Sequence, residues 1–181
     1  MELDGIRAGE DDPTFLSMCP FAPTMLLRDD IMLRDDGDYT YGDDHADLRI
    51  EMANYGLSTG YPIDSFVDIR CACGSDGFEF HSDEEAGVAV RRCGSCRHER
   101  FMADSAGFAE EAKLTSHVCI CGSSHFQLTA GVHRYRRDDD SLAEEVRWTY
   151  IGCRCASCGL VGCYADWKCE HGNYETLLRL M

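Results

Sequence analysis

The sequence predicts a small, mainly β (α+β) fold for this chain of 181 residues. The prediction depends on an internal cysteine repeat, on alternating polar and apolar stretches near each copy, and on an acidic first third rich in turn-forming residues. We therefore expect an acidic, loop-rich N-terminal region that packs on two duplicated β-units, and a short C-terminal helix.

The repeat is the most informative feature of the sequence. Its first copy begins at Cys71 and its second at Cys119, and both read C-x-C-G-S-x-x-F. Each copy ends in a C-x-x-C pair, which lies at 93–96 in the first copy and at 155–158 in the second. The repeat predicts two homologous units, over 71–118 and 119–181, that follow the acidic region over 1–70.

The two copies differ in length between their cysteine pairs. Nineteen residues separate Cys73 from Cys93, whereas 33 separate Cys121 from Cys155. The extra length falls on the charged segment 136–141, so we expect it to extend a hairpin formed by residues 125–136 and 145–154.

The chain contains 12 cysteines, which indicates either disulfides or metal binding. Its first residues, Met1–Asp4, are acidic, and no apolar run of signal-peptide length follows them. No stretch is apolar enough to span a membrane. We therefore expect a cytoplasmic protein with reduced thiols, for which metal is the better interpretation.

The spacing of the cysteines favours zinc. Two thiolates on a tight turn can reach one ion, and Gly74, Gly122 and Gly159 follow cysteines where such a turn needs positive φ. Four thiolates fill a tetrahedral shell and leave no open position, so both sites would be structural, with two Zn²⁺ per chain. The predicted ligands are Cys71, Cys73, Cys93 and Cys96 in site one, and Cys119, Cys121, Cys155 and Cys158 in site two.

These motifs resemble the zinc-ribbon superfamily over residues 71–105 and 119–165. The resemblance implies two metal-binding turns at the ends of a β-hairpin, followed by a third strand. The first pair departs from the family, because it is C-x-C where most ribbons have C-x-x-C.

Four cysteines remain outside the two predicted sites: Cys19, Cys153, Cys163 and Cys169. We interpret them as small core residues. Two alternatives stay open: Cys153 could replace Cys155 as a ligand, and Cys163, Cys169 and His171 could contribute to a third site.

Further elements follow from local patterns. Alternation predicts strands over 47–52, 65–70 and 160–167. A short helix is expected over 108–113, and another over 174–180 with Asn173 or Gly172 as its cap.

The charge is strongly acidic, with a net of −16 and 16 acids against five bases in residues 1–70. Such a surface repels phosphate backbones, so direct nucleic-acid binding is disfavoured and a basic protein partner fits better, although acidity also serves solubility. The candidate partner-binding residues are Asp29, Asp30, Asp35, Asp36, Asp38, Asp43, Asp44, Asp47, Tyr39 and Tyr41.

The motifs of two classes of zinc enzyme are missing from the sequence. It contains neither H-x-E with P-C-x-x-C nor H-E-x-x-H, so we expect no enzymatic activity. One hypothesis is a protein-interaction module, such as an acidic inhibitor or immunity protein that neutralises a basic toxin or nuclease. The alternative is a nucleic-acid-binding or transcription accessory protein that uses the ribbons. The basic and aromatic residues 133–137 are the one patch whose side chains suit nucleic-acid contact. The oligomeric state is left open.

Overall fold

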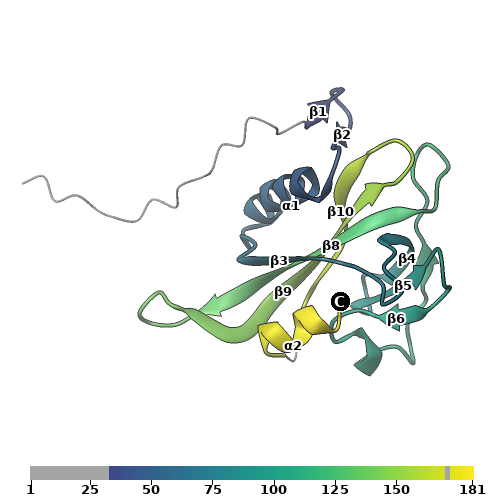
Figure 1. Cartoon of the computed structure of the whole chain (residues 1–181). Helices are drawn as coiled ribbons and strands as arrows, with labels where there is room; N and C mark the ends of the chain where they lie inside the picture. The colour runs from purple at the N-terminus through teal and green to yellow at the C-terminus, as the bar shows by residue number, and fades with distance from the viewer. Residues whose placement is uncertain (1–32, 170–171) are drawn as a thin grey trace, which may run out of the picture.

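The computed structural model describes residues 33–169 and 172–181 (Figure 1). Asp29, Asp30, Cys19 and His171, which the sequence singled out, lie outside the described residues.

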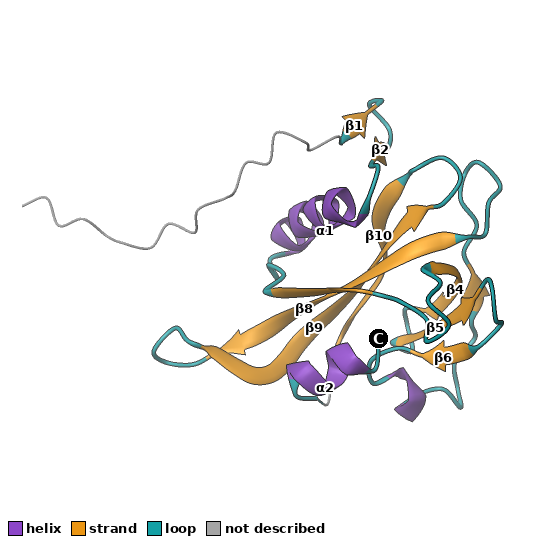
Figure 2. Ribbon diagram, in the orientation of Figure 1, coloured by secondary structure: helices purple, strands orange, loops and turns teal. Residues whose placement is uncertain are grey.

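The described chain is mainly β, with two α-helices and one 3₁₀ turn (Figure 2). The elements are, in order, β1 (Arg34–Asp35), β2 (Thr40–Tyr41), α1 (His45–Thr59), β3 (Ser65–Asp68), β4 (Gly77–Asp83), β5 (Val88–Cys93), β6 (Glu99–Phe101), η1 (Ser105–Gly107), β7 (Thr115–Ser116), β8 (Phe126–Arg136), β9 (Leu142–Cys155), β10 (Val161–Lys168) and α2 (Tyr174–Arg179).

Strands from both copies of the repeat join one antiparallel sheet. Its order is β10-β9-β8-β4-β5-β6, with β3 added to β8 and β7 added to β4. Each copy supplies three consecutive strands, β4-β5-β6 from the first and β8-β9-β10 from the second. The predicted long hairpin is confirmed as β8 and β9.

The two copies meet around a local two-fold axis. Phe78 and Phe126 hold the same place in the repeat, and they pair with one another where β4 meets β8. The strand that precedes each copy pairs with the other copy: β3 lies on β8, with Asp68 opposite Thr129, and β7 lies on β4, with Ser116 opposite His81. Each copy therefore pairs with the strand that precedes the other copy, and these hydrogen bonds join the two copies in one sheet.

The segment predicted as a strand over 47–52 is instead part of helix α1, and that prediction is wrong. Leu48, Met52 and Gly56 are all buried and recur every fourth residue, which is a helical spacing. The Asp44 carboxylate accepts from the N–H groups of Ala46 and Asp47, and Gly60 ends the helix in the left-handed region, with φ of 82°.

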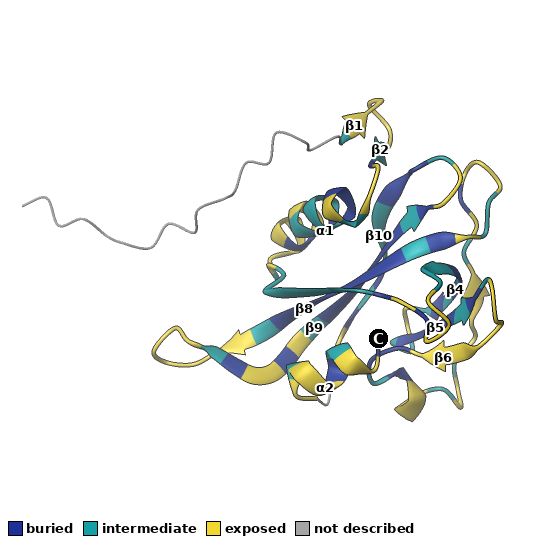
Figure 3. Cartoon of the chain, viewed as in Figure 1, coloured by how far each residue is buried: buried dark blue, intermediate teal, exposed yellow. Residues whose placement is uncertain are grey.

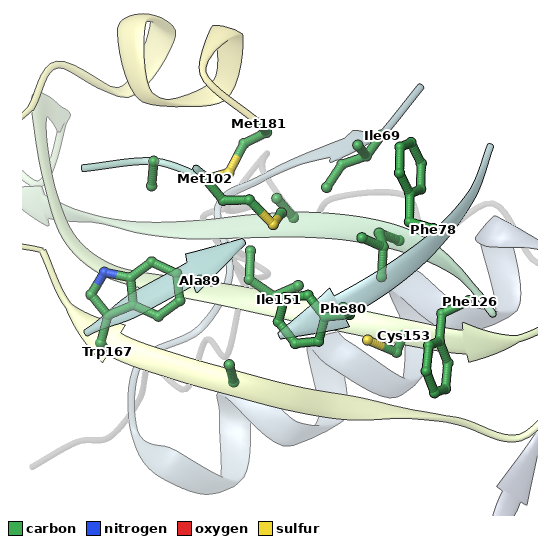
Figure 4. Close-up of a cluster of buried hydrophobic side chains, with 14 of the residues drawn as sticks. Ile69, Phe78, Phe80, Ala89, Met102, Phe126, Ile151, Cys153, Trp167 and Met181 are labelled. Atoms are coloured by element: carbon green, nitrogen blue, oxygen red, sulfur yellow. The ribbon is translucent and has the colours of Figure 1, made fainter. Parts of the chain in front are cut away.

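The sheet is covered on both faces (Figure 3). Tyr150 and Ile151 are neighbours on β9 and point to opposite faces, since side chains alternate along a strand. Tyr150 packs under α1 with Leu48 and Met52. Ile151 belongs to the larger cluster on the other face (Figure 4), where Phe80 and Trp167 also lie.

The remaining predictions have mixed outcomes. The strands expected over 65–70 and 160–167 are confirmed as β3 and β10, and α2 is confirmed with Asn173 as its N-cap. The helix expected over 108–113 does not form: Gly107, which precedes it, has no side chain to cap a first turn, whereas the equally short α2 is capped by Asn173. The 3₁₀ turn η1 precedes it instead.

Candidate metal centres

The structure gathers eight cysteines into two groups of four, and each group is positioned to bind a metal. Within each group the four sulfur atoms lie within 4.8 Å of one another. The groups are Cys71, Cys73, Cys93 and Cys96, and Cys119, Cys121, Cys155 and Cys158.

The sulfur–sulfur distances fit a shared ion. In the first group Sγ of Cys71 lies 3.5 Å from that of Cys96. The matching distance in the second group, from Cys119 to Cys158, is also 3.5 Å. A tetrahedral ion with metal–sulfur bonds of about 2.3 Å separates its sulfurs by roughly 3.8 Å. A disulfide would require about 2.05 Å, so the sulfurs are spaced for a metal rather than for a covalent bond.

The C-x-C-G-S motif builds the same turn in both copies. Cys71 N–H donates to the Ser75 carbonyl at 2.8 Å, and Gly74 N–H donates to the Cys71 carbonyl at 2.9 Å. In the second copy Cys119 donates to Ser123, and Gly122 donates to Cys119, both at 2.8 Å. These bonds fold the backbone back so that both thiols of each motif point to one side.

The glycine of this motif is required by its backbone. Gly74 has φ of 90° and Gly122 has φ of 87°, a region where a Cβ atom causes strain. Gly159, which follows Cys158, has φ of 79°. The position of all three glycines was expected from the sequence.

Backbone amides favour the thiolate form on the C-x-x-C side of each cluster. The N–H groups of Cys96 and Ser95 lower the pKa of Cys93 to about 6. Burial raises the pKa of Cys155, but the N–H groups of Cys158 and Ser157 outweigh it and bring the pKa to about 6. Each cluster therefore contains one cysteine prepared to ionise, and the thiolate is the form that binds metal.

Burial divides each cluster into an inner and an outer part. Cys71, Cys93, Cys119 and Cys155 are buried and belong to the main core. Cys73, Cys96 and Cys121 are exposed. A bound ion would thus join the core of the sheet to its outer turns.

Three other described cysteines lie outside both groups. Cys153 is fully buried in the core, where burial raises its pKa well above the usual value. Burial also raises the pKa of Cys163. Cys169 donates to Asp104 Oδ2 at 3.3 Å. The structure thus places Cys155, and not Cys153, in the second group.

The acidic candidate residues occupy different environments. Asp44 caps α1, and Asp47 is buried and accepts from Asp43 N–H at 2.7 Å, so these two serve the fold. Asp43 pairs with Arg34 at 3.2 Å. The others lie in or next to the β1–β2 hairpin: Asp35, Asp36 and Asp38 are exposed, Tyr39 is 44% exposed, and Tyr41 is half-buried.

Sequence reasoning missed α1 and therefore the surface that it creates. The signals were present in Asp44, a capping residue, and in Gly60, a helix-ending residue. Among the described residues, no helix combines the length and apolarity needed to cross a membrane.

No known family model, curated protein or solved structure matches this chain.

Proposed function

We propose that this chain is a non-catalytic protein-interaction module held together by two structural zinc ions. The observation that carries the proposal is the pair of tetra-cysteine clusters. Four thiolates around one ion leave no position for water or substrate, which is the arrangement of a structural site. Tetrahedral sulfur ligation favours zinc or an iron–sulfur centre, and zinc needs no redox partner.

The strand order supports a zinc-ribbon organisation for both units. In each copy a hairpin connects the two cysteine motifs, and a third strand follows the C-x-x-C pair: β6 after Cys96 and β10 after Cys158. Small hairpins of this kind bury little apolar surface alone, so metal binding would supply much of their stability.

A basic protein is the partner that the charge favours. The chain carries a net charge of −16, and the β1–β2 hairpin presents Asp35, Asp36 and Asp38 on its exposed side. Hydrogen bonds from the N–H groups of Tyr39 and Asp38 lower the pKa of Asp36, which keeps it ionised. An inhibitor or immunity protein that neutralises a basic toxin or nuclease would have this character.

The alternative, direct nucleic-acid binding, requires free arginines around residues 133–137. Arg134 lies over the Tyr174 ring at 4.1 Å, and Arg136 pairs with Asp64 at 3.5 Å. Two of the three guanidinium groups in this segment are engaged within the fold, so this observation favours the protein partner.

Two measurements test the proposal. Elemental analysis of the native, reduced protein should find two zinc ions per chain. Affinity capture from the native cell, followed by mass spectrometry, should identify one dominant basic protein.

A matched pair of charge reversals locates the contact. Asp38→Lys with Asp43→Lys should weaken capture roughly three- to tenfold, because exposed charge pairs contribute modestly. Asp138→Lys with Asp139→Lys, at the tip of the β8–β9 hairpin, makes the same charge change and should have little effect. Metal-free folded protein, or retention on DNA resin at low salt without any captured protein, would contradict the proposal.

A further inference from the structure

A cavity of about 400 Å³ opens beside β10, the strand at one edge of the sheet. Its wall combines the turn after β4, at 84–87, and the end of β10, at 166–168. Asp104 and Phe108, on either side of η1, and Trp148 from β9 complete it. The first copy, the connection between the copies and the second copy all contribute, so the cavity depends on their joining in one sheet.

Aromatic side chains form much of this wall. Both tryptophans of the chain, Trp148 and Trp167, line it together with Phe108, which is 37% exposed. The turn after β4 packs closely on Trp167. A Cβ atom added to Gly87 of this turn would lie 3.1 Å from Trp167 Cδ1, so the glycine backbone lies against the indole. Trp148 stacks on Tyr61 with 4.7 Å between ring centroids. These contacts fix the two indoles before any ligand arrives.

Carboxylates surround the aromatic groups. Glu84, Glu85, Asp104 and Asp166 line the cavity, against one basic residue, Lys168. Within residues 33–169 and 172–181 none of these five side chains takes part in an ion pair. The lining therefore carries a net negative charge that the fold leaves uncompensated.

Neutral donors hold two of the carboxylates in place. Asp166 accepts from Trp148 Nε1 and from the Tyr55 hydroxyl, both at 2.8 Å. Asp104 accepts from Trp167 Nε1 at 3.2 Å and from the Cys169 thiol at 3.3 Å. These bonds orient the carboxylates without neutralising them, so each retains its charge for a ligand.

We propose that this cavity binds the guanidinium group of an arginine presented by a basic protein partner. A guanidinium is planar, so it can stack on an indole while its N–H groups bind carboxylates. The negative lining repels phosphate and carboxylate ligands, and the volume is at the lower end of the range for ligand pockets. The inference rests on the proposed function for the source of the arginine.

The position of the two tryptophans provides a direct assay. Because both tryptophans of the chain line this cavity, a ligand bound there lies near both fluorophores. Zinc-loaded, full-length protein is titrated with the blocked peptide Gly-Gly-Arg-Gly-Gly, and a saturable change in emission is expected. The glutamine analogue should give none, and the lysine analogue and spermidine should bind more weakly.

Matched variants test the contribution of the carboxylates. Glu84→Gln with Glu85→Gln should weaken arginine-peptide binding roughly three- to tenfold, as expected for two partly exposed ion pairs. Asp138→Asn with Asp140→Asn changes the net charge equally at the distant hairpin tip and should leave the affinity unchanged. Circular dichroism and metal content establish that each variant is folded.

Three outcomes would overturn the inference: no saturable response to the arginine peptide, an equal loss in both double variants, or tighter binding of spermidine than of the peptide. The proposed function fails separately. If the Glu84 and Glu85 substitutions leave the capture of a basic protein unchanged, the cavity has no role in binding the partner, and the proposed interaction module still stands. If the arginine peptide binds as expected but no protein is captured, the proposed arginine site stands and the proposed interaction module is wrong.

Discussion

At the scale of single residues, two cysteines on the same strand have different roles. Cys153 and Cys155 are separated by one residue on β9, so both side chains point to the same face of the sheet. Only Cys155 lies at the end of the strand, where its Sγ comes within 3.6 Å of Cys121 Sγ. Cys153 pairs across the sheet with Leu128 and is surrounded by the core.

This difference predicts that substitution by alanine changes the metal content at Cys155 but not at Cys153. Cys155→Ala should reduce the metal content from two ions to one and destabilise the fold by several kcal/mol, since structural zinc supplies on the order of 10 kcal/mol. Cys153→Ala should retain both ions and cost about 1 kcal/mol of lost packing. Elemental analysis and urea unfolding measure both. An equal metal content in the two variants would show that the ligand assignment is wrong.

At the scale of elements, helix α1 rests on the sheet through a glycine. Gly152 on β9 lies directly beneath the helix, and a Cβ atom there would lie 2.7 Å from Met52 Cγ and 3.2 Å from Leu48 Cδ1. Both partners are fully buried, so neither can move aside without disturbing the core.

We therefore expect Gly152→Ala to destabilise the protein by about 1–3 kcal/mol through overpacking. Gly107→Ala is the control, because a Cβ atom there meets nothing within 4 Å, and its effect should stay within about 1 kcal/mol. Thermal unfolding compares the two variants. A destabilisation by Gly107→Ala as large as that by Gly152→Ala would show that the close approach of α1 is not its cause.

The elements were predictable where one local signal dominated. The strands that lead into Cys93 and Cys155 contain apolar and β-branched runs, and Asn173 marks the start of α2. The sequence pattern predicts a strand over residues 47–52, where the structure has a helix, because alternation over six residues fits a strand and also fits part of a helix. Capping residues at both ends, Asp44 and Gly60, favour the helix. Tyr150 and Val161 of the sheet pack against the buried side of this helix.

At the scale of the whole molecule, protons and metal compete for the same sulfurs. The pKa of Cys93 and of Cys155 is lowered to about 6, so the folded state favours their thiolates. A group with a lowered pKa contributes stability above its unfolded value, and that contribution is lost as the pH falls through the folded value. Bound metal extends the effect to lower pH, because it binds only the thiolate.

We expect acidification from pH 8 to pH 4 to release the metal and unfold the sheet together, with the loss below about pH 6. A chelator at neutral pH should cause the same loss of structure. A metal-sensitive dye and circular dichroism, recorded in parallel, follow the two events. Complete metal release from protein that keeps its fold would contradict a structural role for the ions.

The sequence by itself determined the two cysteine groups and the strands that carry them, since each group is made by short motifs joined through one hairpin. Tertiary structure alone decided the exchange of β3 and β7 between the copies, the placing of α1, and the acidic and aromatic cavity beside β10. The physical reason is range. A tight turn or an alternating strand is fixed by neighbouring residues, whereas these three features depend on contacts between residues far apart in the chain, and no local pattern encodes them.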